Sequence, residues 1–171
     1  MKKTVWTFGL ISGAVSAAMM LGTIPFADTI GFDRGVIVGY TTMVLAGLFI
    51  FFGIRSYREQ VGGAITFGKA FTVGSLITLI SCVCYVITWE VMYFKLMPGF
   101  VEKYTSYAVS QLKASGATQQ AIEARVRDMQ RFKELYDNPL INAAITFIEP
   151  FPVGLVITLI SSAVLRKKAK S

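Results

Sequence analysis

The chain has 171 residues, of which 54% are hydrophobic and 16% are charged, and its formal net charge is +7. Soluble domains carry about 25% charged residues, so this composition and a mean hydropathy of +0.58 argue against an ordinary soluble protein. The sequence contains no histidine, which removes the commonest metal ligand and the usual general base. The length fits one compact unit, and we expect a single domain over residues 1–171.

Four long apolar stretches follow one another along the chain. Each reaches the roughly 20 residues that cross a hydrocarbon core about 30 Å thick. They predict an all-α, polytopic membrane protein with four transmembrane helices, over residues 4–26, 35–54, 71–96 and 140–165.

The first stretch has an alternative interpretation. Lys2 and Lys3 followed by the small residues 16–18 are typical of a cleaved signal peptide. The apolar run continues to Phe26, however, and Trp6 is placed as an interfacial anchor, so we expect a retained span.

Small residues recur at helical spacing and predict close helix packing. Residues 73–81 and 153–161 match at seven of nine positions, by duplication or by chance. Cys82 and Cys84 form only a weak metal motif, and we expect packing roles and neither a metal nor a cofactor. The predicted packing positions are Gly9, Gly13, Gly74, Thr78, Cys82, Gly154, Thr158 and Ser162.

Ionisable residues at membrane depth are functional candidates. Glu90 comes about 29 Å after the start of the third span, at the outer interface. Glu149 precedes Pro150; we favour a kinked helix here, and the alternative is a helix that starts at this proline. Arg34 is a candidate partner for both acids. The main interpretation of Glu90 and Glu149 is that each forms a structural pair with another polar group at the membrane interface. The alternatives are a polar cavity for transport or binding, and proton-labile catalysis.

Residues 99–138 separate the last two spans. Helical spacing of their apolar residues, interrupted at Ser115-Gly116, predicts an extracytoplasmic hairpin of two amphipathic helices. This hairpin either presents a partner site or only caps the bundle.

The cations near the span ends predict the threading. One side would carry nine basic residues and a single acidic residue, Glu59. The basic residues are Lys2, Lys3, Arg55, Arg58, Lys69, Arg166, Lys167, Lys168 and Lys170. We therefore expect both termini in the cytoplasm, in contact with anionic lipid headgroups, and no nucleic-acid partner.

The motifs Phe52–Arg58, Gly63–Phe71, Tyr136–Pro139 and Glu149–Gly154 resemble those of the domain of unknown function 4199 family. The resemblance covers nearly the whole chain. It implies a small bacterial inner-membrane protein with four helices, and it supplies no activity or binding site.

Three functions remain open. The first is a non-enzymatic accessory, scaffold or self-associating subunit, and the second is a small proton- or cation-coupled transporter that uses the membrane carboxylates. An intramembrane enzyme is the weakest, because no nucleophile–base pair or metalloprotease motif occurs.

Overall fold

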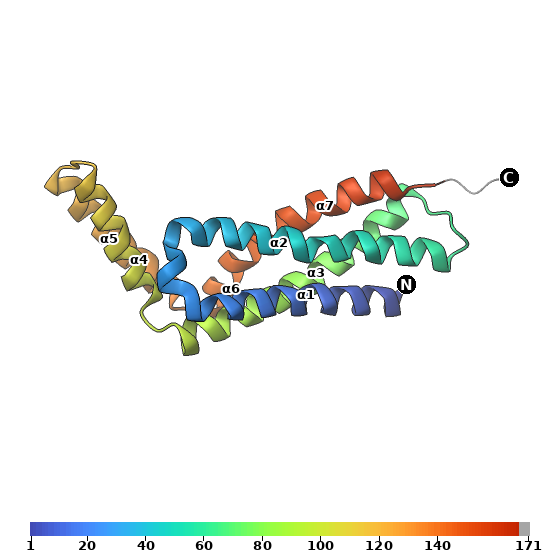
Figure 1. Cartoon of the computed structure of the whole chain (residues 1–171), viewed down its shortest axis with the longest axis horizontal. Coiled ribbons are helices and arrows are strands. Elements are labelled where there is room, and N and C mark those ends of the chain that lie inside the picture. Colours follow the sequence, from blue (N-terminus) through green and yellow to red (C-terminus); the bar gives the residue numbers. More distant parts are fainter. Residues whose placement is uncertain (168–171) are drawn as a thin grey trace. The chain divides into compact units, whose positions relative to one another are not determined.

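The computed structural model describes residues 1–167, and this part of the chain is mostly helical, with short connecting loops and no strand (Figure 1). The predicted all-α class is confirmed. The elements are α1 (Lys2–Thr23), the 3₁₀ turn η1 (Ile24–Phe26), α2 (Ala27–Gln60), α3 (Phe67–Val91), the π-helical segment η2 (Met92–Leu96), α4 (Phe100–Ala114), α5 (Gln119–Tyr136), α6 (Pro139–Ile148) and α7 (Pro150–Leu165).

Contacts divide the chain into two compact units. The first, here called the bundle unit, comprises Met1–Thr88 and the chain from Thr146 onward. The second, the α4–α5 unit, comprises Trp89–Ile145. The expectation of a single domain stays a prediction.

In the bundle unit, α1 and α2 run antiparallel. The Thr4 hydroxyl donates to the Gln60 side chain at 3.1 Å, and the Ser12 hydroxyl donates to the Ala46 carbonyl at 2.9 Å. The chain reverses through η1, and Gly31 then takes a left-handed φ of +66° inside α2, where a side chain would be strained. The expected link between the first two spans is therefore largely helical.

The other two helices of the bundle unit continue this alternation. Gly9 and Gly13 of α1 pack against Ile80 and Cys84 of α3, so these two helices run in the same direction. Arg58 near the end of α2 donates to the Leu165 carbonyl at the end of α7, so α2 and α7 share the opposite direction. The result is an up-down-up-down arrangement of α1, α2, α3 and α7 (Figure 1).

Three continuous helical segments of the described residues are long and apolar enough to cross a membrane: Lys2–Gln60, Phe67–Leu96 and Pro139–Leu165. At most 39% of the most apolar window in each segment is buried inside the protein. The remaining apolar side chains face outward; Ile37 and Val164, for example, are 68% and 67% exposed. Such surfaces are compatible with contact to lipid.

The last of these segments is interrupted at Glu149. Pro150 and Pro152 lack the N–H groups that would bond to the Thr146 and Ile148 carbonyls. Glu149 nevertheless keeps helical dihedrals, φ −68° and ψ −60°, between α6 and α7. The structure thus combines both expectations, because the backbone stays helical through Glu149 and a new helix starts at Pro150.

Candidate functional site

The interior of the bundle unit is closed by a reciprocal contact between α3 and α7. Gly74 faces the side chain of Thr158, and Gly154 faces the side chain of Thr78. The two threonine hydroxyls lie 3.1 Å apart and form a buried hydrogen bond. Because the matching segments cross antiparallel, each glycine admits the threonine of the other helix.

The other predicted packing residues lie in the same interior. Cys82 is 2% exposed, and Ser162 is fully buried with no hydrogen-bond partner for its Oγ among the described residues. A Cβ on Gly9 or Gly13 would meet the side chain of Ile80 or Cys84 at 2.8 or 2.5 Å. These short approaches explain why glycine occupies both positions.

A small cavity lies beside the α3–α7 contact. Its free space of about 20 Å³ holds roughly one water molecule. All four helices contribute to its wall, and most of its polar groups are hydroxyls. Its polar lining residues are Ser12, Ser16, Thr78, Ser81, Cys82 and Tyr85.

Two of these hydroxyls already form a chain that links three helices. The Ser12 and Ser81 oxygens lie 2.8 Å apart, and Ser12 also donates to Ala46. The sequence did not reveal that Ser12 and Ser81 are partners. The available signal in the sequence was that each of them is a polar residue within an apolar stretch.

Glu149 is connected to this cavity by one side chain, that of Tyr85. The hydroxyl of Tyr85, which lines the cavity, donates to Glu149 Oε2 at 3.2 Å. Arg34, the predicted partner, is an exposed residue of α2. The polar partner that the structure gives Glu149 is therefore Tyr85.

Glu90 belongs to the α4–α5 unit and is partly buried. Its Oε1 is buried and has no hydrogen-bond partner among residues 1–167. The neighbouring Trp89 donates its Nε1–H to the Tyr136 hydroxyl at 2.9 Å. The Trp89 ring thus fixes this turn of α3 to the end of α5.

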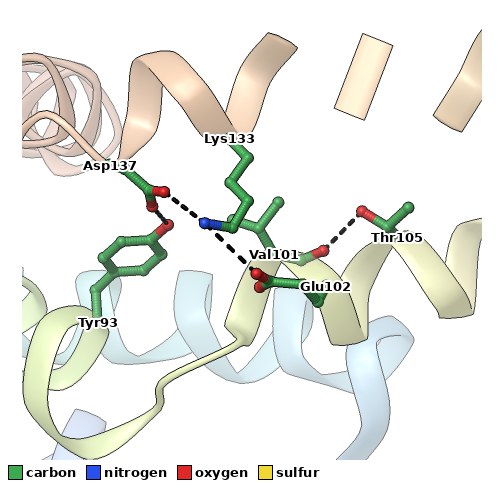
Figure 2. Close-up of polar contacts among 6 residues, drawn as sticks. All are labelled: Tyr93, Val101, Glu102, Thr105, Lys133 and Asp137. Atoms are coloured by element: carbon green, nitrogen blue, oxygen red, sulfur yellow. Dashed lines mark hydrogen bonds and ion pairs between the residues drawn. The ribbon is translucent and has the colours of Figure 1, made fainter. Parts of the chain in front are cut away.

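A polar network closes the α4–α5 unit (Figure 2). The Tyr93 hydroxyl donates to Asp137 Oδ1 at 2.7 Å. The ammonium of Lys133 pairs with Asp137 and lies 3.4 Å from Glu102 Oε1. The network therefore connects η2, α4 and the end of α5.

Charge pairing shifts the pKa values of two members of this network, Asp137 and Lys133. The hydrogen bond from Lys133, followed by that from Tyr93, lowers the pKa of Asp137. The same contact with Asp137 raises the pKa of Lys133. Sequence reasoning missed this network because its members lie on three different elements.

Nothing in the described part of the chain forms a group of three or more cysteine, aspartate or glutamate side chains that could hold a metal ion. Each unit by itself offers packing contacts, hydroxyls and carboxylates.

An all-helical fold, with helices apolar enough to cross a membrane and an interior closed by small residues, has the features of a membrane protein. A family model described as "protein of unknown function (DUF4199)" matches residues 7–167, so the chain belongs to this family. The resemblance in its motifs is thereby confirmed. None of the curated proteins and none of the solved structures matches the chain.

Proposed function

We propose that the protein is a four-span integral protein of the bacterial inner membrane, with both termini in the cytoplasm. The observation that carries this proposal is the bundle of four apolar helices with outward-facing apolar side chains. The antiparallel contact of α1 with α2 makes two spans of the segment Lys2–Gln60. The α6–α7 segment supplies the fourth.

The proposed role is that of a non-enzymatic accessory, scaffold or self-associating subunit. The small-residue positions of the bundle unit serve internal packing, which supports a structural use for them. The α4–α5 unit carries many exposed charged side chains and would form the extracytoplasmic contact surface. Strictly monomeric protein in mild detergent, without crosslinked partners in the membrane, would contradict this role.

The topology is tested with single cysteines in a Cys82→Ser, Cys84→Ser background. Val61→Cys and Ser115→Cys both place a thiol at an exposed position, after α2 and after α4 respectively. A membrane-impermeant maleimide should label Ser115→Cys on intact cells and Val61→Cys only after permeabilisation. The reverse order, or folded protein recovered in buffer without detergent, would overturn the proposal.

A second candidate, a proton- or cation-coupled transporter, is favoured by the hydrogen bond between Tyr85 and Glu149 beside the hydroxyl-lined cavity. Membrane carboxylates commonly mark proton and ion pathways. Glu149→Gln and Glu90→Gln should then each change pH-dependent flux in proteoliposomes. Flux that is the same in both variants and the wild type would eliminate these acids as couplers.

A further inference from the structure

The interior of the bundle unit changes its chemistry along the helix axes. Toward the end that holds the N-terminus, the core is an apolar cluster that includes the fully buried Ile54, Val73 and Ile77. The same end of α7 also buries Ser161 and Ser162, but neither residue lines the cavity. Further along the helices, hydroxyls form most of the polar lining of the cavity. The free space of the interior therefore lies where hydroxyls surround it.

The cavity matches a neutral hydrogen-bonding ligand. Each hydroxyl of its wall is both a donor and an acceptor, and no charged side chain lines it. Polar cavities of this size hold ordered water, whereas apolar cavities stay dry. A bound cation would lack a counter-charge in the wall, since Glu149 is not a lining residue and is bonded to the Tyr85 hydroxyl.

Polar side chains connect the cavity to the end of the bundle unit opposite the N-terminus. Tyr85 and Pro150 line it, and Tyr85 bonds to Glu149, which is exposed at the α6–α7 interruption. In the other direction, the Thr78–Thr158 hydrogen bond and the apolar cluster close the interior.

We infer that this cavity is a water-binding site reached from the membrane side opposite the termini and closed toward the side of the termini. The inference rests on the proposed four-span topology and adds a ligand and a sided access route to it. Water would thus enter the bundle unit from one side of the membrane and reach no further than the crossing of α3 and α7.

Cys82 is a natural reporter, because its side chain lines the cavity. Silver ion is comparable in size to a water molecule and binds thiolates. The full-length Cys84→Ser protein is treated with silver nitrate in right-side-out or inside-out vesicles, and the thiol that remains is counted with a maleimide after denaturation. A terminal tag establishes the vesicle orientation independently.

Silver should react with Cys82 faster from the side opposite the tagged terminus. Ser16→Val should slow this reaction by about tenfold or more, because the added methyl groups fill a space that holds only one water molecule. Ser16→Ala, the milder variant, enlarges the cavity and should leave the reaction as fast or faster. Thr41→Val removes an exposed hydroxyl that bonds only within α2 and serves as the matched control.

Equal reaction from both sides, faster reaction from the side of the termini, or no reaction in either Ser16 variant would overturn the inference. If the protein stays in the membrane with both termini on one side, such a result leaves the proposed function standing. A saturable rise of the melting temperature with sodium or lithium nitrate would also overturn it, in favour of a cation site.

Discussion

At the α3–α7 contact, the methyl group and the hydroxyl group of Thr78 have different roles. The Cγ2 methyl of Thr78 is the atom closest to where a side chain on Gly154 would begin. The Oγ1 of the same residue is hydrogen-bonded to Thr158 at 3.1 Å. Helix approach and helix pairing therefore depend on separate atoms, which mutations can remove one at a time.

Gly154→Ala should destabilise the protein by about 1–3 kcal/mol, the usual cost of overpacking a closed interior. The new Cβ would overlap the Thr78 methyl, so α3 and α7 would have to separate. The free energy of unfolding is measured by denaturant titration in detergent micelles. Gly39→Ala is the matched control, because nothing lies within 4 Å of its added methyl group; it should be neutral or stabilise the helix by up to about 1 kcal/mol.

Thr78→Ser removes the overlapping methyl and keeps the hydroxyl. Gly154→Ala should therefore cost less in a Thr78→Ser background than in the wild type. Additive costs in this double-mutant cycle would show that the Thr78 methyl is not the obstacle.

The sequence shows the residues of this contact because glycine and threonine recur at i and i+4 in two matching segments. It does not show which other helices meet them. In α2, Gly39 and Gly47 are also spaced by a multiple of four residues, yet Gly39 has open space beside it and Gly47 lies against Ile157. The Tyr85–Glu149 bond likewise depends on which turns of α3 and α7 lie level, which no local pattern specifies.

At the scale of elements, η2, α4 and α5 are joined by a few side chains. Aromatic rings surround the joint, and Tyr93 lies edge-on to Tyr136 with ring centroids 5.1 Å apart. Val101 and Met129 are buried in the same cluster. The other contacts named here are aromatic or apolar, whereas the polar network of Figure 2 contains carboxylates that can bind protons in acid.

Acid should weaken this joint through Asp137. Its pKa is lowered in the folded protein, so its stabilising contribution is complete above the ordinary value of 3.8 and is lost as the pH falls through the lower folded value. The side chains of Asp137 and Lys133 are 43% and 36% exposed, so the effect should not exceed about 1 kcal/mol. Fluorescence of Trp89 in a Trp6→Phe protein reports the transition.

Asp137→Asn should abolish this acid transition, because the side chain no longer binds a proton there. Asp128→Asn, at an exposed position of α5, should leave it unchanged. An acid transition that persists in Asp137→Asn would assign the effect to another carboxylate, with Glu102 the nearest alternative.

Element boundaries were partly predictable. The interruption expected at Ser115-Gly116 falls between α4 and α5, where Gly116 has a φ of +75°. Residues 27–34 were expected to form a link, because charged residues interrupt the apolar run there. They are mostly helical instead, since a turn needs only η1 and the left-handed Gly31 to reverse the chain.

At the scale of the whole bundle unit, basic residues gather at one end of the four helices. Lys2 and Lys3 open α1, Arg58 lies near the end of α2, and Lys69 lies near the start of α3. An antiparallel bridge between Ile65 and Lys167 holds the loop before α3 to the end of α7, with N···O distances of 3.0 and 2.9 Å. Lys168 and Lys170, which were predicted on this side, lie outside the described residues.

This concentration of charge predicts a preference for anionic lipid. A cation near an anionic surface contributes roughly 1 kcal/mol of attraction, and a ligand that binds only the folded state raises its stability. The melting temperature should therefore be higher in nanodiscs of phosphatidylglycerol than in nanodiscs of phosphatidylcholine. The difference should shrink in high salt, because ions screen exposed charges beyond about 10 Å at 0.1 M.

Replacing Lys2, Lys3 and Lys69 together by glutamine should remove much of this lipid preference. Arg34→Gln is the matched control, because Arg34 lies near the opposite end of α2, beside Asp33 and close to Asp28. Its removal should leave the preference intact if the basic end alone meets anionic headgroups. If the melting temperature at low salt is the same in both lipids, or if Arg34→Gln lowers the preference as much as the triple variant, the charged end does not bind lipid and the cytoplasmic placement of the termini loses its physical basis.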